Sequence, residues 1–431
     1  MTMRRLYGLG LLGTSLASTA CAGDRESDGA DATAGIATAG MLPGGDSDDA
    51  DEGSTAGVTG AQSGGSEDDS SGGGPGLPKF DLGQGGPGSG GEDDCITGPN
   101  EDADGDGWSV AQGDCNDCDP NANPAAIEVV VTGPDELGNV PLPADEDCDG
   151  QVDNPPLPCD GGLALDDLDP TNGARAIGLC KTAVGANDWG VVSASYVRAD
   201  GVPNAGGQQV GLQTQWGTNV TTQEGESMLV LSSGHSRSIG QAGACNALSC
   251  TGTGAGTPPA GFPQDVPGCA GLSTINDDIA LEVTLRAPSN AIGYSYDFSF
   301  YSFEYPEWVC TAFNDQYIAL VTPPPEGSIN GNISFDSQSN PVSVNIAFFE
   351  VCSGCNLGTD ELAGTGFDVW DDAGATSWLV TTAPVTGGEE FTIRFAIWDT
   401  GDSAWDSTVL IDNFQWIADG AEVDVGTEPE G

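Results

Sequence analysis

The chain has 431 residues, enough for two or three domains, and its 66 Asp and Glu outnumber its 10 Lys and Arg to give a net charge of −56. So acidic a chain has no basic surface with which to displace counterions from nucleic acid, and anionic membrane surfaces would repel it. The composition excludes nucleic-acid partners and favours cations.

Residues 1–21 predict export. Two arginines precede an apolar run, and small residues then lead to Cys21, as in a secretory signal peptide that is too short to span a membrane. The segment resembles a bacterial lipoprotein signal, which implies lipidation of Cys21 and a place on the outer membrane or cell surface of a Gram-negative bacterium, with membrane contact through the lipid alone. Ser18 departs from the leucine usual in that motif, so cleavage after Ala20 and simple secretion are the alternative.

Residues 22–94 are a low-complexity run of Gly, Ser, Asp, Ala and Thr without apolar periodicity. Such a segment cannot bury a core, and we expect a disordered acidic linker there. Setting Cys21 aside leaves an even number of the 13 cysteines. Exported cysteines are mostly paired, so we expect the remainder to form disulfides.

Residues 95–159 are rich in Asp, Cys and Pro and poor in large apolar residues, so this segment needs disulfides or metals to fold. Two stretches, DADGDG at 102–107 and DEDCDG at 145–150, place Asp at positions one, three and five and Gly at position six. Such carboxylates converge on one hard cation, the carbonyl of the seventh residue adds a ligand, and oxygen-only ligation favours Ca²⁺. The predicted metal ligands are Asp102, Asp104, Asp106, Trp108, Asp114, Asp117, Asp119, Asp145, Asp147, Asp149, Gln151 and Asp153.

Neither stretch is an EF-hand loop, because position twelve holds Gly113 in one and Pro156 in the other, where an EF-hand needs an acid. The run DADGDGWSVAQGDCNDCDPNANPAAIE, followed by DEDCDGQVDN, resembles the MopE-type metal-binding motif of bacterial surface proteins over about residues 100–154. The resemblance suggests a disulfide between Cys115 and Cys148, with Cys95 and Cys118 as a further, guessed pair. We expect the calcium to fold this module rather than to act as a signal.

From residue 160 to 420 the composition changes to short β-branched or alternating runs separated by turn residues. The runs are WGVVSASYV, SMLVLSS, IALEVTLRA, AIGYSYDFSFYSF, QYIALVT, VSVNIAFFEV, SWLVTT, FTIRFAIWD and TVLIDNFQWI. Many short strands without helical stripes predict a mainly β fold, an antiparallel, jelly-roll-like β-sandwich. Residues 421–431 read as an acidic tail.

Two long stretches of this region, YSFEYPEWVCTAFNDQYIALVT at 301–322 and FAIWDTGDSAWDSTVLIDNFQW at 395–416, resemble the choice-of-anchor L domain of bacterial secreted proteins. The resemblance extends over about residues 185–418. It implies an extracellular location and a fold class, but no reaction, because the family has no defined biochemical activity.

Acidic residues gather at two turns of the β-rich region, and end loops of this kind hold Ca²⁺ in many carbohydrate-binding sandwiches. A second calcium site is therefore a hypothesis, with Glu304, Asn314, Asp315, Asp399, Asp402 and Asp406 as its ligands. Aromatic side chains that can stack on sugar rings lie nearby, namely Tyr305, Trp308, Trp398 and Trp405. The alternative is that the aspartates cap turns and the tryptophans fill the core.

Catalytic patterns are weak in this chain. His235 is the only histidine and lies in a polar stretch, no spacing selects a carboxylate pair, and Cys352 and Cys355 fit a structural disulfide better than a redox motif. We therefore predict a non-enzymatic cell-surface lipoprotein with a calcium-binding module and an extracellular adhesion domain for glycan or protein. The alternatives are a surface copper-binding protein, for which one histidine and four methionines offer few soft ligands, and a secreted polysaccharide hydrolase.

Overall fold

The computed structural model describes residues 98–131, 133, 142–250, 253–346, 348–370, 373–418 and 422–430. The predicted signal peptide, the lipidation of Cys21 and the linker at 22–94 lie outside the described residues. Within the described part, strands dominate and the one α-helix is short (α1, Pro170–Arg175). No helix there has the length and apolar character needed to cross a bilayer.

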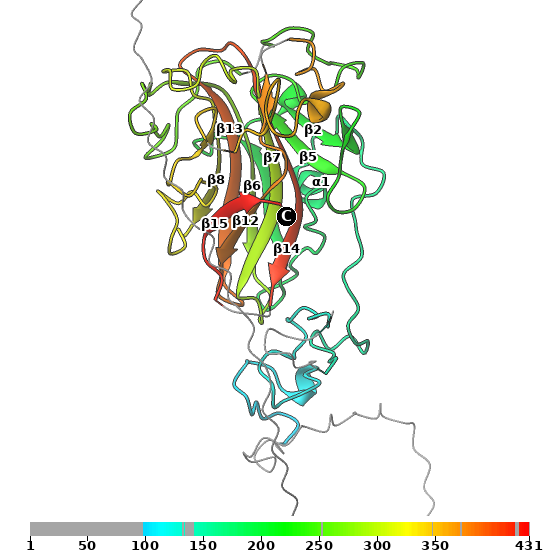
Figure 1. Cartoon of the computed structure of the whole chain (residues 1–431). Helices are drawn as coiled ribbons and strands as arrows, with labels where there is room; N and C mark the ends of the chain where they lie inside the picture. The colour runs from blue at the N-terminus through cyan, green and yellow to red at the C-terminus, as the bar shows by residue number, and fades with distance from the viewer. Residues whose placement is uncertain are drawn as a thin grey trace, which may run out of the picture. The chain divides into compact units, whose positions relative to one another are not determined.

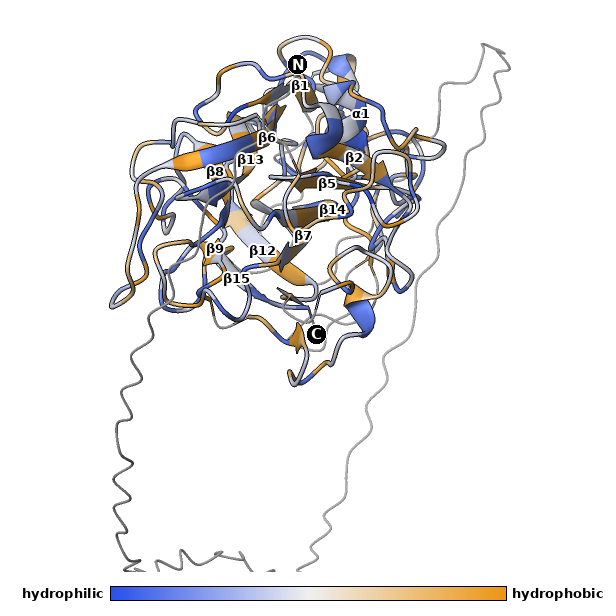
Figure 2. Ribbon diagram, turned by 90° about the horizontal axis from the view of Figure 1, so that it is seen from above, coloured by the Kyte–Doolittle hydropathy of each residue, from blue (hydrophilic) through white to orange (hydrophobic). Residues whose placement is uncertain are grey.

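Two antiparallel sheets form the body of the β-rich region, and their strands appear as two rows in the view from above (Figures 1 and 2). One sheet has the order β1-β6-β13-β8-β9, with bounds Gly190–Val197, Ile275–Arg286, Glu390–Thr400, Gln316–Thr322 and Val342–Ser343. The other has the order β10-β11-β7-β14-β5-β2, with bounds Val351–Cys352, Gly374–Ala375, Gly293–Ser302, Ser407–Ile417, Met228–Ser232 and Val210–Gln213.

Four further strands complete the β structure. β12 (Leu379–Pro384) pairs with β7 and with β15 (Gly426–Pro429), while β3 (Gln215–Trp216) and β4 (Val220–Thr221) pair with each other. The predicted mainly β, antiparallel sandwich-like fold is confirmed.

The main core lies between the two sheets because successive strand residues face opposite sides. Along β7, Tyr294, Tyr296, Phe298 and Phe300 belong to this interior, whereas Tyr301 packs on the other side of its sheet. All five side chains are almost completely buried. The alternate aromatic residues of β7 therefore lie on one face of the strand, which packs into the main core.

Loops cover part of both outer faces, so the central strands are apolar on both sides. Trp216, Phe303 and Phe367 belong to a cluster on the outer face of the β7 sheet. Phe262 and Trp398 belong to a cluster on the outer face of the β13 sheet, with their rings edge to face at 6.3 Å. Trp398 is therefore a core side chain and is not available for stacking on a sugar.

Two segments differ from the sequence-based expectation. The sequence predicts one strand over residues 342–351, and this prediction is wrong. Only the two ends of the run form strands, β9 and β10, and the described residues between them include a turn. Val344 and Ile346 are buried in that turn, so a buried turn produces the apolar pattern of a strand. In the expected acidic tail, β15 pairs with β12, and the hydroxyls of Thr381 and Thr427 lie 2.8 Å apart.

Strand register brings four strand ends together at one end of the sandwich. β7 ends where β14 begins, since Ser302 pairs with Ser407, and β13 approaches its end where β8 begins, since Trp398 pairs with Gln316. The first pair belongs to one sheet and the second pair to the other. A hydrogen bond of 2.6 Å from Ser407 Oγ to Asp315 Oδ2 links the two sheets there.

Five disulfides connect described residues: Cys115–Cys148, Cys159–Cys180, Cys245–Cys250, Cys269–Cys310 and Cys352–Cys355. The first is the pairing suggested by the resemblance to the MopE-type motif, and it joins the two Asp-rich loops. The guessed pair of Cys118 with Cys95 cannot be followed, because Cys95 lies outside the described residues.

Candidate metal centres

The two Asp-rich loops share one pattern of backbone hydrogen bonds. In each, the sixth residue donates its N–H to the first-position Asp, the fifth residue to the third-position Asp, and the seventh residue to the fifth-position Asp. The N···O distances are 3.1, 3.2 and 2.7 Å in the loop at 102–107 and 3.0, 3.0 and 2.8 Å in the loop at 145–150. The two loops are therefore structural equivalents.

Left-handed backbone at the fourth and sixth positions closes both turns. Gly105 and Gly107 have φ angles of 84° and 95° in the first loop, and Gly150 has 89° in the second. The fourth position of the second loop is Cys148, with φ 57°, a conformation that is costly for a residue with a Cβ. Cys148 thus combines the turn with the disulfide to Cys115.

Five carboxylates gather around the first loop. Asp102, Asp104 and Asp117 bring ligand oxygens within 4.8 Å of one another, and so do Asp104, Asp106 and Asp114. In Asp104, Asp106 and Asp114 each Oδ1 accepts a backbone N–H, whereas each Oδ2 is buried and has no hydrogen-bond partner among the described residues. Burial, followed by the charges of neighbouring aspartates, raises the pKa of Asp114 to about 6 and also raises that of Asp104. A cation between these oxygens would remove both the repulsion and the unmet hydrogen bonding.

A second group of carboxylates surrounds the loop at 145–150. Glu128, Asp145 and Asp147 bring ligand oxygens within 4.8 Å of one another. Three further oxygens are buried and have no hydrogen-bond partner in the described part of the chain: Glu128 Oε2, Asp145 Oδ1 and Asp153 Oδ1. Burial raises the pKa of Glu128 to about 7, with a further contribution from the charge of Asp147. Glu128 was absent from the predicted ligands, and its place in the motif-like run is the signal that could have identified it.

Several predicted ligands of the module lie outside both groups. Asp119 Oδ1 accepts the N–H of Asn121 at 3.1 Å and caps a turn. Asp149 is exposed, and hydrogen bonds from Asn154 and Gln151 lower its pKa. Trp108 and Gln151, predicted as carbonyl ligands, donate their N–H groups to the loop hydrogen bonds.

Four acidic side chains meet at the end of the sandwich where the four strand ends converge. Glu304 follows β7, Asp315 precedes β8, Asp399 lies at the end of β13 and Asp406 precedes β14. Their residues are only 2, 0, 1 and 4% exposed, respectively. Both sheets therefore contribute buried carboxylates to this end of the sandwich, which we call the acidic end cluster (Glu304, Asp315, Asp399 and Asp406), although no three of them bring ligand oxygens within 4.8 Å of one another.

Hydrogen bonds hold part of the acidic end cluster. Asp315 Oδ1 accepts the N–H of Thr400 at 2.9 Å, and its own N–H donates to Glu304 Oε2 at 3.3 Å. Asp406 Oδ1 has no hydrogen-bond partner among the described residues, whereas the side chains of Ser233 and Asp315 lie close enough to Asp399 to form side-chain hydrogen bonds that affect the pKa of these carboxyls.

Burial and like charge raise every pKa in the acidic end cluster. Burial, with the charge of Asp315 next, raises the pKa of Glu304 to about 10. Burial raises the pKa of Asp315 to about 7 and that of Asp406 to about 8. Burial, then the charges of Asp315 and Asp406, raises the pKa of Asp399 well above its usual range.

No basic side chain among the described residues forms an ion pair with the acidic end cluster. The ion pairs in this part of the chain are Lys181–Asp188, Arg198–Asp278, Arg286–Glu390 and Arg394–Glu282. Asp277, which the sequence did not single out, is a further buried carboxylate whose charge raises the pKa of Asp399 and Asp406.

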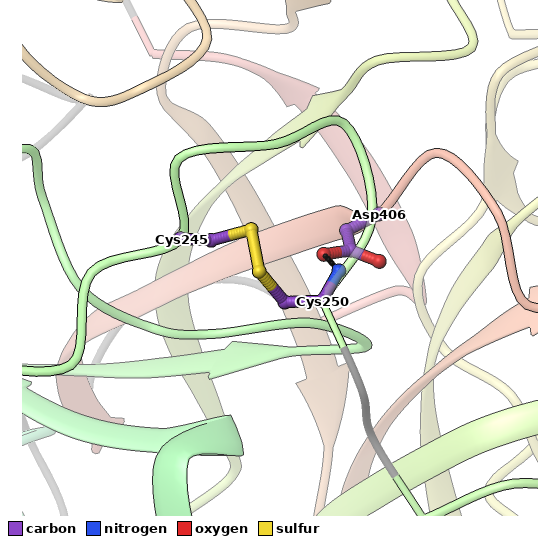
Figure 3. A group of neighbouring side chains, drawn as sticks. All are labelled: Cys245, Cys250 and Asp406. Carbon is purple, nitrogen blue, oxygen red and sulfur yellow. Dashed lines mark hydrogen bonds between the residues drawn. A yellow bond between two sulfur atoms is a disulfide. The ribbon is translucent and has the colours of Figure 1, made fainter.

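A disulfide positions Asp406. Cys245, Cys250 and Asp406 form a close group (Figure 3), but the two sulfurs are bonded to each other and are not the thiolates that bind metals. Instead, the N–H of Cys250 donates to Asp406 Oδ2 at 2.8 Å. A Cβ added at Gly234 would lie 1.8 Å from the same oxygen, so the backbone there packs directly on the carboxylate.

The other predicted residues of this region fall at the margin of the acidic end cluster. Asn314 is buried and its Oδ1 accepts no hydrogen bond from a described residue, whereas Asp402 is exposed in the turn between β13 and β14. The ring of Tyr305 stacks on that of Phe349, with the two centroids 4.2 Å apart. Trp308 and Trp405 are half-buried and pack edge to face at 5.3 Å.

One comparison with known proteins gives a match. A family model, the Choice-of-anchor L domain, matches residues 179–415. No curated protein matches the chain, and neither does any solved structure. The matched span includes the whole acidic end cluster and excludes both Asp-rich loops.

Proposed function

Because the chain belongs to the choice-of-anchor L family, whose domains are extracellular or at the cell surface and generally not catalytic, we propose that it is a calcium-dependent surface protein. The Asp-rich module binds Ca²⁺ through its two loops, and the sandwich binds an extracellular glycan or protein. Attachment is through lipid on Cys21, with simple secretion as the alternative. Binding of the intact protein to a glycan array, compared with capture of a protein ligand, distinguishes the two kinds of partner.

The observation that carries the calcium proposal is the set of buried, partnerless carboxylate oxygens around both loops. Among the described residues of 98–154, the buried apolar side chains are only Ala122, Ala125 and Ala126. Three alanines bury too little surface to order a segment of this length, so another source of stability is needed. Cation binding supplies it and makes binding and folding of the module one event.

The chemistry of the ligands favours calcium over the alternative of copper. Both groups consist of carboxylate oxygens, and the nearby Cys115 and Cys148 are bonded to each other. Hard oxygen ligands suit Ca²⁺, whereas copper prefers imidazole, thiolate or thioether. The resemblance to the MopE-type motif agrees with a metal site without deciding the metal.

Calorimetry on the full chain tests the proposal. Ca²⁺ should bind with dissociation constants of roughly 10⁻⁴–10⁻³ M, the range of extracellular modules. Asp104→Asn should remove binding at the first loop and Asp147→Asn binding at the second, because each change removes one charge from a group of three carboxylates. Glu101→Gln is the matched control and should bind as the wild type does, since Glu101 is exposed, lies outside these groups and accepts the N–H of Gly98 with its Oε2.

Three results would contradict this function. An unchanged Ca²⁺ titration in the Asp104→Asn, Asp147→Asn double variant would remove the calcium sites from the loops. Much tighter binding of Cu²⁺ than of Ca²⁺ at neutral pH would favour a copper-binding protein. Release of soluble sugar from polysaccharide by the purified wild-type chain would favour a hydrolase.

A further inference from the structure

The turn between β6 and β7 is hydrogen-bonded to the Asp-rich module, and both belong to the same compact unit of the chain. Asn290 pairs with the backbone of Ile127: its Nδ2 donates to the carbonyl at 2.8 Å, and its Oδ1 accepts the N–H at 3.0 Å. The N–H of Ser289 donates to the carbonyl of Ala125, also at 2.8 Å. We call these hydrogen bonds the docking contact (Ala125 and Ile127 with Ser289 and Asn290).

The sandwich side of the docking contact is a fixed surface. Asn290 is 5% exposed, and both ends of its amide are hydrogen-bonded, as a buried polar group requires. A Cβ added at Gly387 would lie 1.9 Å from the carbonyl oxygen of Ser289, so the turn between β12 and β13 packs directly against this one. The polar groups of the turn therefore match the backbone of the module in one orientation.

The docked segment also contributes to the second carboxylate group of the module. Glu128 directly follows Ile127, and with Asp145 and Asp147 it brings ligand oxygens within 4.8 Å of one another. Glu128 Oε1 accepts the N–H of Asp147 at 3.3 Å, whereas its Oε2 is buried and accepts no hydrogen bond from a described residue. The segment thus connects the loop at 145–150 to the sandwich.

The charge of this group acts on the docked segment. Without a cation, the like charges of Glu128, Asp145 and Asp147 act to separate the segment from the loop. A cation among the three carboxylates replaces this repulsion by attraction and holds Glu128 in place. Because Ile127 is the neighbouring residue, its N–H and C=O are then held where Asn290 can pair with them.

We propose that Ca²⁺ at the second carboxylate group docks the Asp-rich module on the turn between β6 and β7, with Asn290 as the positioning residue. This role rests on the proposed function, since it needs Ca²⁺ at the loop at 145–150. The ion then decides whether the sandwich is held rigidly on the module. The coupling is reciprocal, so docking must strengthen Ca²⁺ binding at this group by the factor by which Ca²⁺ strengthens docking.

The first loop should not control docking. Trp108, which follows that loop, lines a hollow of about 420 Å³ together with Val184 and Asn187 of the sandwich. A hollow has few atoms in contact across it and transmits little of the order that an ion gives to the loop. Loss of the ion from the loop at 102–107 should therefore leave the docking contact in place.

Amide hydrogen exchange on the full chain, in CaCl₂ and in EDTA, tests the proposal. The N–H groups of Ile127 and Ser289 both donate across the docking contact. In EDTA they should exchange roughly 5–150-fold faster than in CaCl₂, the usual range of coupling between two sites. Asp147→Asn in CaCl₂ should give the same acceleration. Asp104→Asn, the same change in the other loop, should not.

Calorimetry on the full chain measures the reciprocal effect. Asn290→Ala should weaken Ca²⁺ binding at the second carboxylate group by the same factor and leave binding at the first loop unchanged. Asn340→Ala is the matched control and should bind as the wild type does, because Asn340 is similarly buried but donates to Asp336 within the sandwich. Ser289→Ala removes a hydroxyl contact of 2.8 Å with Asn123 Oδ1. It should weaken the same site to a smaller extent, and it replaces Asn290→Ala if that variant does not fold.

Three results would overturn the docking role and leave the proposed function intact. One is equal exchange of the two amides in CaCl₂ and EDTA while both loops bind Ca²⁺. Another is wild-type Ca²⁺ binding in both Asn290→Ala and Ser289→Ala. The third is an acceleration of exchange in Asp104→Asn as large as that in Asp147→Asn. By contrast, failure of the proposed function appears as Ca²⁺ binding that Asp104→Asn and Asp147→Asn do not change.

Discussion

In Asp104, Asp106 and Asp114, one carboxylate oxygen accepts a backbone N–H and the other has no hydrogen-bond partner within the part of the chain that the structure describes. The first oxygen shapes the loop and the second is available to a cation. An Asp→Asn change keeps an oxygen that can accept the backbone hydrogen bond but removes the charge. Asparagine variants therefore remove the charge while keeping the backbone hydrogen bond of the loop, which alanine variants would not do.

Asp412 shows how a buried carboxyl couples stability to pH. It is fully buried, and the N–H groups of Gln223, Glu224 and Asn413 donate to it at 2.7, 3.4 and 2.7 Å. These hydrogen bonds favour the ionised form, but burial is the larger effect and raises its pKa to about 8. The folded chain therefore retains a proton at this residue that the unfolded chain loses at much lower pH.

The sign of this coupling makes a prediction. Since the folded pKa is raised, the contribution of Asp412 to stability is complete below about pH 4 and is lost as the pH rises towards 8. In Asp412→Asn, the free energy of unfolding, measured with urea in saturating CaCl₂, should fall less steeply between pH 5 and 8. The slope should differ by at most about 1.4 kcal/mol per pH unit, the limit for one proton.

Asp149→Asn is the control for the pH series. Its pKa is lowered, so its own contribution changes at pH values below those measured. Its slope between pH 5 and 8 should match that of the wild type. Equal slopes for Asp412→Asn and the wild type would show that Asp412 is ionised in the folded protein at neutral pH.

At the scale of the elements, β15 protects an edge of the larger sheet. It pairs with β12 over four residues, from Leu379 with Pro429 to Thr382 with Gly426. An unpaired strand edge presents a row of N–H and C=O groups to which another chain can add. Residues 426–429 thus cover the edge of β12 with a short strand.

Thr427→Pro should uncover this edge, because proline lacks the N–H and is poorly tolerated within a sheet. We expect a lower unfolding temperature and concentration-dependent self-association in light scattering. Thr427→Val is the control: it loses the hydroxyl contact with Thr381 but keeps the strand, so it should remain unassociated. Identical behaviour of the two variants would mean that backbone pairing at β15 does not protect the edge.

The sequence predicts a strand correctly where one face of the strand packs into the main core along its whole length and the other face has one kind of environment. Runs such as QYIALVT and TVLIDNFQWI alternate between the main core and a loop-covered outer face, and they form β8 and β14. The error at 342–351 has a different cause, because Val344 and Ile346 are buried by a turn and not by a strand. An apolar sequence indicates that a segment is buried, and only backbone hydrogen bonding and register distinguish a buried turn from a buried strand.

The candidate sites could be predicted in part for a similar reason. Spacing within a loop identifies Asp104 and Asp106, because neighbours in sequence are neighbours in space. Glu128 and Asp277 reach their groups from distant positions in the chain, so no local spacing marks them. The residues of the acidic end cluster are predicted from the acidic composition of two turns. The strand register that brings these two turns to the same end of the sandwich depends on the fold and cannot be read from the sequence.

At the scale of the whole molecule, charge opposes folding. The net charge is −56, and only 10 basic residues are available to offset it. Repulsion between these like charges destabilises the compact state. At 0.1 M salt, the repulsion between exposed charges more than about 10 Å apart is largely screened.

The unfolding temperature should therefore rise with NaCl between 0.01 and 0.5 M, which scanning calorimetry measures. At equal ionic strength, CaCl₂ should raise it further than MgCl₂ or NaCl, since specific sites bind only the cation that fits. The Asp104→Asn, Asp147→Asn double variant should keep the response to NaCl and lose the extra response to CaCl₂. If CaCl₂ and MgCl₂ raised the unfolding temperature of the wild type equally, the effect of calcium would be explained by charge screening alone.

The disulfide between Cys115 and Cys148 has a consequence for the survival of the protein outside the cell. Its two cysteines are 33 positions apart; the first Asp-rich loop precedes Cys115 and the second contains Cys148. A protease that cuts any one peptide bond between residues 115 and 145 leaves both loops intact on fragments that stay covalently joined. The halves then remain at a high effective concentration relative to each other and can be held together by the same cations. A nicked chain thus keeps its amino-terminal segment attached to the sandwich.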